Sequence, residues 1–458
     1  MIESDAFKLL LINLFHLNPD DIANIFCTTF NKMMVLLVTL ADKHQACPYC
    51  GFTAPKIKEY VTKEITHSAL TTQKCIIKYR ARRYKCPCCG KTYYEFNPFV
   101  FKSQKISILT VHNILKDLKD FNETFTSVAR RYHVSPTSVS TIFDNHVDIG
   151  RNPLPEIINF DEVYAFKSEK SKYVCVLLDF KKQIPVDVLP NRKKEYLLNY
   201  FQKIPLEERK KVKYACSDMY EVYRDVVHKV FPCSCMLLDY FHLSQDFHRK
   251  MNEVRIKVMK GYKDDKASDE YYLLKKFNWL LFKNPEDEDK YGRLFDVERE
   301  RKYNSHFKSY MNYYDLRRKL LEINNDLTIC YSLKLELVDF YSKSTIDNAQ
   351  VNLEHLIRSC IDTNIEEMIA FSNNLINWKQ EIINSFTIVG TEYKVKADKG
   401  QVVVCNKKVN NAIIENRNKI IKCIKNNANG YTNWSRFRNR VMYVLDPNTT
   451  FSLEPREK

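Results

Sequence analysis

The sequence of 458 residues is long enough for about two to four domains, and its 45% apolar and 28% charged residues are typical of a folded globular protein. The 72 Lys and Arg against 56 Asp and Glu give a net charge of +16, which predicts a polyanionic partner, most often nucleic acid. Only eight glycines occur, and no two lie closer than ten residues apart. This spacing excludes the Walker A loop and the GxGxxG fingerprint, and with them P-loop motors and standard Rossmann enzymes.

Apolar runs and cysteines bear on the cellular compartment. The best apolar run, residues 33–41, has nine residues, about half of what a transmembrane helix needs. Acidic and polar residues precede this run, where a secretory signal would have a short basic segment. The fifteen cysteines are odd in number, and several stand singly in apolar runs. We therefore expect reduced thiols and a cytoplasmic, nucleoid-associated protein without a membrane segment.

Residue patterns divide the chain into six predicted segments. They are a mostly helical segment at 1–45, a zinc-binding domain at 46–100, a helix-turn-helix at 104–150, strands and helices in the order βββαβαβ at 155–245, a helical insertion at 246–400, and basic helices at 401–446.

Two pairs of cysteines have the spacing of a structural zinc site. Cys47 with Cys50 and Cys86 with Cys89 each form a Cys-x-x-Cys turn followed by glycine. Tetrahedral zinc takes four such ligands, and the glycine permits a left-handed residue in each turn. We predict Zn²⁺ bound by these four thiolates, with Cys88 as a bystander. A redox pair or buried free thiols is the alternative.

Between the cysteine pairs, residues 78–85 carry five basic side chains in eight positions, interleaved with two tyrosines. A solvated strand edge would also account for this pattern. Beside a zinc ribbon, we predict contacts from Arg80, Arg82 and Arg83 to DNA phosphates.

Residues 124–144 have the pattern of two short helices joined by a tight turn. Ser135 is a predicted N-cap, and Pro136 occupies the first helical position, where a missing N–H is tolerated. Thr137, Ser138 and Ser140 then project outward from the second helix, as the residues of a recognition helix do. Helix pairs of this kind are also common in plain helical bundles, so the reading as a DNA-binding element depends on the zinc ribbon and the basic charge.

Three predicted strands at 157–161, 212–218 and 235–239 end on the carboxylates Asp161, Asp218 and Asp239. Adjacent strand ends in a sheet can bring such residues together. Two carboxylates several ångströms apart are what a pair of Mg²⁺ ions needs to hold a phosphodiester. Acidic residues also end strands as ordinary turn residues, which is the alternative.

A single acid, Glu415, stands among nine Lys and Arg in residues 406–440. It lies on a predicted amphipathic helix, where it could pair with a lysine at i+4 or serve as a third metal ligand. We predict that the basic residues of this region contact DNA. The residues concerned are Lys419, Lys422, Lys425, Arg436 and Arg438.

The order of these parts resembles the DDE transposases of bacterial insertion sequences, specifically the ISL-three family, over nearly the whole chain. The stretches that carry the resemblance are the zinc knuckles, the helix-turn-helix, Asp161-Glu162, Ser217-Asp218-x-Tyr220, Asp239-x-x-His242-Leu243, residues 272–281, and the C-terminal run from Glu415 and Asn418 to Gly430-Tyr431-x-Asn433-Trp434.

This resemblance implies a multi-domain α+β chain in which a zinc ribbon and helix-turn-helix precede a ribonuclease-H-like α/β catalytic domain interrupted by an all-helical insertion. It implies Asp161, Asp218 and Glu415 as the catalytic triad that binds Mg²⁺ or Mn²⁺. Asp239 and His242 match the family's Asp-x-x-His motif and are interpreted as support near the site. The family often has glycines on both sides of the turn that contains its glutamate, and this chain departs from that pattern with Ala412 and Asn416.

The implied function is binding of the terminal inverted repeats of an insertion sequence, followed by metal-dependent cleavage and strand transfer by a homodimer or larger assembly on double-stranded DNA. One rival is a zinc and helix-turn-helix regulator with an inactive transposase-derived domain, and metal-dependent nicking separates the two. A second rival is a nuclease such as a resolvase that cuts without joining, which detection of joined products would exclude. A coiled-coil protein is disfavoured because residues 246–385 lack a sustained heptad.

Overall fold

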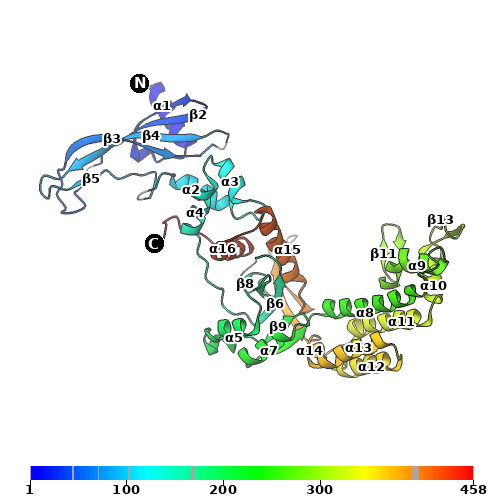
Figure 1. Cartoon of the computed structure of the whole chain (residues 1–458). Helices are drawn as coiled ribbons and strands as arrows, with labels where there is room; N and C mark the ends of the chain where they lie inside the picture. The colour runs from blue at the N-terminus through cyan, green and yellow to red at the C-terminus, as the bar shows by residue number, and fades with distance from the viewer. Residues whose placement is uncertain are drawn as a thin grey trace.

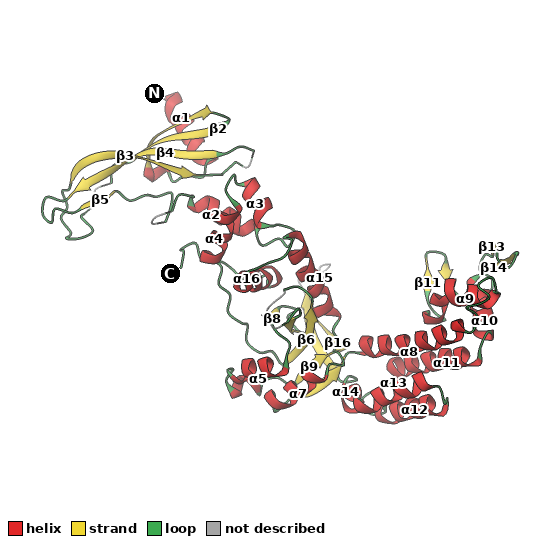
Figure 2. Cartoon of the chain, in the orientation of Figure 1, coloured by secondary structure: helices red, strands yellow, loops and turns green. Residues whose placement is uncertain are grey.

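The computed structural model describes residues 2–43, 46–70, 72–101, 104–166, 171–394 and 402–456. Figure 1 shows an extended chain in which an N-terminal sheet, a small group of helices, a central sheet and a helical arm follow one another. Helices and strands both contribute (Figure 2), so the predicted mixed α+β class is confirmed. Near its end the chain returns, and α15 (Ala412–Asn427) and α16 (Trp434–Leu445) lie between the small helices and the central sheet.

The N-terminal part is a five-stranded sheet on which one helix, α1 (Ile2–Leu14), packs. The strands are β1 (Ile22–Phe30), β2 (Met33–Leu40), β3 (Lys56–Thr66), β4 (Cys75–Lys85) and β5 (Thr92–Tyr94). They are arranged in the order β1-β2-β4-β3, with β5 paired to β4. β2 and β4 run parallel, and the other neighbours are antiparallel.

The prediction that residues 1–45 are mostly helical is wrong beyond α1. β1 and β2 form a hairpin whose turn residues, Asn31 and Lys32, have φ angles of 49° and 60°. A two-residue turn with both φ angles positive matches the twist of the flanking strands, but here no glycine marks it in the sequence. β2 is rich in Met and Leu, which favour helices, and its parallel partner β4 begins only at Cys75, so no local pattern marks β2 as a strand.

Three short helices form a compact group around one apolar core. They are α2 (Ile108–Asp117), α3 (Phe125–Arg131) and α4 (Pro136–His146). The hydroxyls of Ser107, Thr124 and Ser135 each accept a hydrogen bond from a backbone N–H in the first turn of their helix. The prediction of Ser135 as N-cap with Pro136 beginning α4 is confirmed. Between α3 and α4 the chain reverses at His133, whose φ is 53°.

The central sheet has five strands in the order β10-β9-β6-β7-β8. The strands are β6 (Ile157–Val163), β7 (Val174–Asp179), β8 (Pro185–Leu189), β9 (Tyr214–Ser217) and β10 (Cys235–Leu238). β6, β9 and β10 run parallel, whereas β7 and β8 are antiparallel to their neighbours. The element order matches the βββαβαβ pattern predicted for this region, except that a short helix, α6 (Leu206–Arg209), follows α5 (Lys194–Gln202).

Helices cover both faces of this sheet. Phe160 and Leu177 pack on one face against α5 and α7 (Glu221–Val230). Val176 packs on the other face against Ile421 of α15 and Phe437 of α16. Neighbouring residues of β7 therefore point to opposite layers, as strand geometry requires. Because both faces are buried, the strand ends are held on a rigid support.

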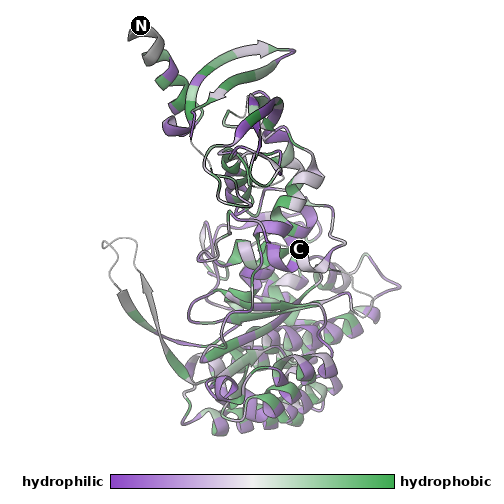
Figure 3. Cartoon of the chain, turned by 90° about the vertical axis from the view of Figure 1, so that its left-hand side faces the viewer, coloured by the Kyte–Doolittle hydropathy of each residue, from purple (hydrophilic) through white to green (hydrophobic). Residues whose placement is uncertain are grey.

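The helical arm leaves the central sheet directly after β10 with the 21-residue helix α8 (Tyr240–Lys260). The other helices of the arm are α9 (Asp269–Lys276), α10 (Tyr313–Glu322), α11 (Asn325–Lys343), α12 (Ala349–Asp362), α13 (Glu366–Asn377) and α14 (Lys379–Asn384). They share a large apolar core of their own. No described helix is long and apolar enough to cross a membrane, and Figure 3 shows polar residues interspersed along the helices.

The prediction of an all-helical insertion at 246–400 is wrong, because its described part includes strands. They are β11 (Glu288–Asp289) with β12 (Gly292–Arg293), β13 (Lys302–Asn304) with β14 (Ser309–Met311), and β15 (Ile388–Lys394), which pairs with β16 (Val402–Lys408). The first two hairpins have strands of two or three residues, too short to show alternation in the sequence. Residues 395–400 of the predicted insertion lie outside the described residues.

Candidate active site and zinc centre

Three acidic residues lie where neighbouring strands of the central sheet end. Asp161 is near the end of β6, Asp218 directly follows β9, and Asp239 directly follows β10. Because these strands are parallel neighbours, their ends meet at one edge of the sheet. The carboxyl ends of parallel strands are where α/β sheets usually present functional side chains.

Glu415 lies in the first turn of α15, and hydrogen bonds from asparagine side chains connect this turn to β6. Asn159 Nδ2 donates a hydrogen bond to Asn411 Oδ1 at 2.6 Å, and Asn411 Nδ2 donates to a backbone carbonyl of β6 at 3.2 Å. One turn after Glu415, Asn418 Nδ2 donates to Asp161 Oδ2 at 2.7 Å. These bonds fix the first turn of α15 against the strand that carries Asp161.

His242, in the first turn of α8, lies between Asp239 and Glu415. Its Nε2 atom is 3.8 Å from Asp239 Oδ2 and 3.9 Å from Glu415 Oε1. Each of the three residues offers a potential ligand atom within 4.8 Å of the other two. The alternative pairing of Glu415 with Lys419 is absent from the ion pairs of the described residues, and Lys419 Nζ instead donates to Asn416 Oδ1 at 3.3 Å.

Several polar atoms at this edge are buried without a hydrogen-bond partner. Within the described part of the chain they include Asp218 Oδ1, Asp239 Oδ2 and His242 Nε2. An unsatisfied buried polar atom costs about 1–3 kcal/mol, and a bound cation would remove that cost for a carboxylate oxygen. Carboxylates suit Mg²⁺ and Mn²⁺, so these residues fit the divalent ions that the sequence predicts.

Burial raises the pKa of each strand-end carboxyl. Burial and the charges of Asp218 and Glu162 raise the pKa of Asp161 to about 7. Burial also raises the pKa of Asp218 and of Asp239, and the Glu415 charge adds to the rise at Asp239. A cation among these groups would favour their charged forms.

Arg192 is a neighbour of the site that sequence reasoning missed. It forms an ion pair with Glu162, and its guanidinium lies 4.8 Å from the centre of the Tyr220 ring. Its charge opposes the rise in the pKa of Asp218. No spacing in the sequence marks Arg192. Asn418 does stand in the C-terminal stretch that resembles the transposase family, which was the available signal for its role.

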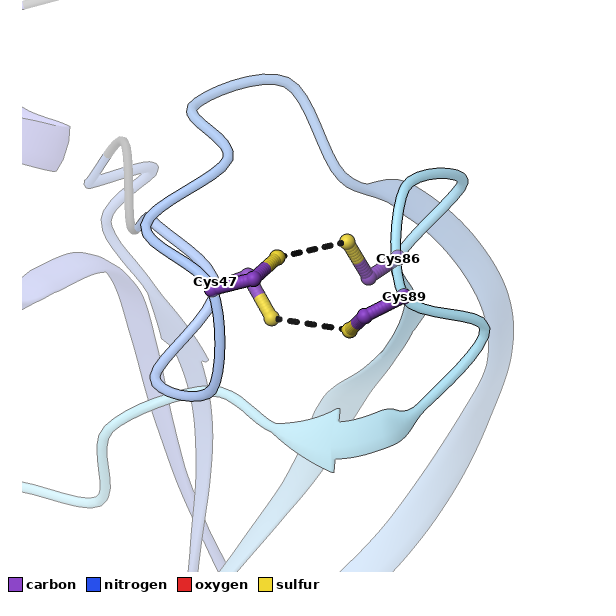
Figure 4. Close-up of side chains that lie close together, drawn as sticks. Cys47, Cys86 and Cys89 are labelled. Atoms are coloured by element: carbon purple, nitrogen blue, oxygen red, sulfur yellow. Dashed lines mark hydrogen bonds between the residues drawn. The ribbon is translucent and has the colours of Figure 1, made fainter.

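The four predicted zinc ligands converge at the open end of the β3–β4 pair, where β3 begins and β4 ends. Figure 4 shows Cys47 facing Cys86 and Cys89. The Sγ atoms of Cys47 and Cys89 are 3.7 Å apart, and those of Cys50 and Cys86 are 3.6 Å apart. Four thiolates bound at about 2.3 Å to one zinc ion lie about 3.8 Å apart, so this arrangement fits Zn²⁺. Cys88 is exposed and outside the group.

Local geometry explains why each cysteine pair forms this turn. Gly51 and Gly90 follow the two pairs with φ angles of 75° and 72°, the left-handed region that favours glycine. Their N–H groups donate to the carbonyls of Cys47 and Cys86 at 2.8 and 2.9 Å. A hydrogen bond from the backbone N–H of Cys89 lowers the pKa of Cys86 to about 7, whereas burial and hydrogen bonds shared with the other thiols raise the pKa of Cys50 and Cys89. A bound zinc ion would deprotonate these thiols.

The predicted DNA-contacting arginines of β4 differ in their surroundings. Arg80 is exposed, with its guanidinium 4.9 Å from the centre of the Tyr60 ring. Arg83 Nη1 lies 2.7 Å from a Glu59 carboxylate oxygen. The Arg82 side chain is 15% exposed and pairs with the buried Glu95 at 2.8 Å. Arg80 is therefore the most solvent-exposed of the three, whereas the charge of Arg82 is used in an ion pair within the sheet.

The predicted DNA-contacting residues of α4 and α15 are mostly accessible. Thr137 is exposed, Ser138 shares a 2.8 Å hydrogen bond with the N-cap hydroxyl of α4, and Ser140 donates to the Thr137 carbonyl at 3.0 Å. Lys419 and Lys422 of α15 are exposed. These two lysines give α15 free positive charge close to Glu415.

Two predicted DNA-contacting arginines of α16 bind carboxylates within the chain. Arg436 pairs with Asp144 of α4 at 2.6 Å, and Arg438 pairs with Asp187 of β8 at 2.7 Å. These ion pairs attach α16 both to the small helices and to the central sheet. Lys425, at the end of α15, is half-buried with its Nζ 5.1 Å from a tyrosine ring centre.

The C-terminal stretch that carries the resemblance serves packing in the structure. Asn433 caps α16 by accepting a hydrogen bond from a backbone N–H at 2.9 Å. The Trp434 ring packs 5.1 Å from the Phe166 ring, and the Tyr431 ring lies 5.2 Å from another aromatic ring of α16. The buried Arg440 donates to two backbone carbonyls between α2 and α3 at 2.8 Å. These contacts fix the position of α16 between the small helices and the sheet.

Comparison with known proteins assigns the chain to a family. The family model DDE_Tnp_ISL3, described as transposase, matches residues 158–392, a little over half of the chain. A curated relative, the transposase for insertion sequence element IS1001 from Bordetella parapertussis, is 20% identical over 409 residues, which cover 89% of this chain and 90% of that protein. The chain therefore belongs to the ISL3 family of transposases. The matched region contains Asp161, Asp218, Asp239 and His242, and Glu415 lies beyond it.

Proposed function

We propose that this chain binds the terminal inverted repeats of an insertion sequence and catalyses DNA cleavage and strand transfer with divalent metal ions at Asp161, Asp218 and Glu415. The observation that carries the proposal is that Asp161 and Asp218 stand at or near the ends of two parallel neighbouring strands, while Asn418 ties the helix of Glu415 to Asp161. Among the described residues, one buried carboxylate oxygen of Asp218 has no hydrogen-bond partner. A meander of antiparallel strands followed by two parallel strands supports the ribonuclease-H-like catalytic domain that the family resemblance implies.

The side chains of the site would hold the metal ions and the reacting DNA in place. When bound at these carboxylates, Mg²⁺ or Mn²⁺ would act as a Lewis acid on the oxygens of a phosphodiester. Asp161 is oriented on both sides, because Asn418 donates to Oδ2 and the backbone N–H of Glu162 donates to Oδ1, each at 2.7 Å. In this scheme water cleaves the end of the element and the released 3′-OH attacks target DNA, so no serine or tyrosine forms a bond to DNA.

DNA recognition is assigned to the parts that precede and follow the catalytic sheet. The zinc-binding sheet and the helices α2 to α4 would bind the inverted repeats, with Arg80 and Thr137 among the open side chains. Lys419 and Lys422 would contact phosphates beside the acids, and such contacts make affinity depend on salt. Both ends of an element must be processed together, so we propose a homodimer or larger assembly on DNA.

Cleavage of DNA that carries the element's own terminal repeats tests this proposal. We expect Mg²⁺- or Mn²⁺-dependent cuts at the repeat ends, lost in Asp161→Asn and in Glu415→Gln. Asp179→Asn is a matched control, because Asp179 also ends a strand of the central sheet and is 7% exposed, but its Oδ1 accepts hydrogen bonds from the backbone of its own turn. This variant should cut normally.

Two other outcomes would contradict the proposal in different ways. Tight binding of the repeats without cutting, under either metal ion, would favour a DNA-binding regulator with an inactive catalytic domain. Cutting that survives substitution of Asp161 or Glu415 would place the active site on other acids.

A further inference from the structure

The tightest group of potential metal ligands at the catalytic edge is not the expected triad. It consists of Asp239, His242 and Glu415, whose ligand atoms all lie within 4.8 Å of one another. The two distances from His242 Nε2, 3.8 Å to Asp239 Oδ2 and 3.9 Å to Glu415 Oε1, are too long for hydrogen bonds. These three side chains therefore face one another without bonding to one another.

The facing atoms have no other partners among the described residues. Asp239 is only 2% exposed, and its Oδ2 atom has no hydrogen-bond partner. His242 Nε2 is likewise buried and unpaired. In the described part of the chain, the ion contacts of Asp239 and Glu415 involve only this imidazole. Two acids and a ring nitrogen thus face one another, and no lysine or arginine in the described ranges forms an ion pair with either acid.

The backbone accounts for this convergence. Asp239 occupies the N-cap position of α8, and His242 lies three residues later, so both side chains lie on one face of the first turn. Glu415 comes from the first turn of α15, which Asn411 and Asn418 hold against β6. The three potential ligands are therefore carried by the first turns of two anchored helices, which suits a preformed site.

We propose that Asp239, His242 and Glu415 bind one divalent ion through two carboxylates and the His242 imidazole nitrogen, so that this site prefers a first-row transition-metal ion such as Mn²⁺ over Mg²⁺. Mg²⁺ binds oxygen ligands almost exclusively, whereas imidazole is a good ligand for transition metals. Asp161 and Asp218 remain for a second ion. The use of this site in catalysis rests on the proposed function, but the binding of the ion does not.

Electron paramagnetic resonance of Mn²⁺ bound to the full-length, zinc-loaded protein tests the ligand set. A directly bound imidazole couples the ¹⁴N nucleus to the electron spin of Mn²⁺, which pulsed measurements detect. We expect this coupling in the wild type and its loss in His242→Gln, with Mn²⁺ affinity reduced about tenfold or more and Mg²⁺ affinity little changed. His248→Gln is the matched control, since His248 lies on the same helix at intermediate exposure and contacts aromatic rings.

Several results would overturn the inference. His242 is not a ligand if Mn²⁺ does not bind, or if it binds without ¹⁴N coupling. Coupling that persists in His242→Gln would likewise show that another nitrogen binds the ion. Cleavage assays on the same samples separate this failure from failure of the proposed function. Mg²⁺-dependent cutting without ¹⁴N coupling would leave the transposase proposal intact, whereas coupling without cutting in any metal ion would leave the metal site intact and remove the proposed activity.

Discussion

Replacing Asp161 with asparagine should stabilise the protein in the absence of Mg²⁺ and Mn²⁺. Burial and neighbouring acids raise the pKa of Asp161 from its ordinary value of 3.8 to about 7. The folded state therefore retains a proton at pH values where the unfolded chain has released it, and stability falls as the pH rises from about 4 to about 7. Each tenfold change in proton affinity corresponds to about 1.4 kcal/mol, so the free energy of unfolding at neutral pH falls by at most about 4 kcal/mol.

The surroundings of Asp161 can accept an asparagine. Asn418 now donates to Asp161 Oδ2, and its own Oδ1 is buried without a partner. If the Asn418 amide turns over, that oxygen accepts a hydrogen bond from the new side-chain amide. The backbone N–H of Glu162 can still donate to the remaining carbonyl oxygen. Because these bonds are kept and local relaxation already offsets part of the burial cost, we expect Asp161→Asn to gain about 1–3 kcal/mol at pH 7.5.

Urea unfolding at pH 4.5 and pH 7.5, with and without Mn²⁺, measures this effect. Without Mn²⁺, the variant should be more stable than the wild type at pH 7.5 and nearly equal to it at pH 4.5. Added Mn²⁺ should stabilise the wild type more than the variant, because only a state that binds the ion gains from it. If Asp161→Asn is less stable than the wild type at pH 7.5 without metal, or equally stabilised at both pH values, the ionised Asp161 carboxylate does not destabilise the fold. Asp179→Asn serves as the control for altered strand ends.

Three further predictions follow from the structure. Cys86→Ser should abolish the binding of one zinc ion per chain, whereas Cys88→Ser should retain it, as metal analysis after gel filtration would show. Burial lowers the pKa of Lys334 from 10.5 to about 8, so the wild type should gain stability in urea unfolding as the pH rises from about 8 to about 10.5, by at most about 3 kcal/mol. Lys334→Met loses the hydrogen bonds from Nζ to two backbone carbonyls but has no amine to titrate, so it should show no such rise. Lys422→Ala should weaken DNA binding and lower the magnitude of the slope of log affinity against log salt concentration by about 1. Arg438→Ala should instead lower the melting temperature of the protein, because Arg438 pairs with Asp187.

Local patterns in the sequence were sufficient to predict most of the central sheet. Its strands are mostly buried and mostly apolar runs, and two of them, β9 and β10, are followed by acids at positions visible in the sequence. The four cysteines of the zinc centre could also be predicted, because a Cys-x-x-Cys motif with a following glycine specifies its own turn. The hairpin of β1 and β2 was missed because its turn lacks glycine and because the second neighbour of β2, strand β4, is distant in the sequence.

The rest of the candidate site depends on contacts that no local pattern encodes. Asn418 binds Asp161 across 257 residues of sequence, and His242 meets Glu415 only because α8 and α15 both begin at the same sheet edge. The basic composition likewise could not separate Lys422, which is exposed, from Arg438, whose charge is used inside the chain.

We propose that one site holding Asp161, Asp218 and Glu415 joins DNA as well as cutting it. The most direct measurement supplies a pre-cut repeat end with a free 3′-OH, a supercoiled target plasmid and Mn²⁺, and scores covalently joined products. We predict joined products with the wild type and with Asp179→Asn, and none with Glu415→Gln. Cutting of uncut ends without any joined product would contradict the claim and indicate a nuclease, and joining that persists in Glu415→Gln would show that Glu415 is not part of the site.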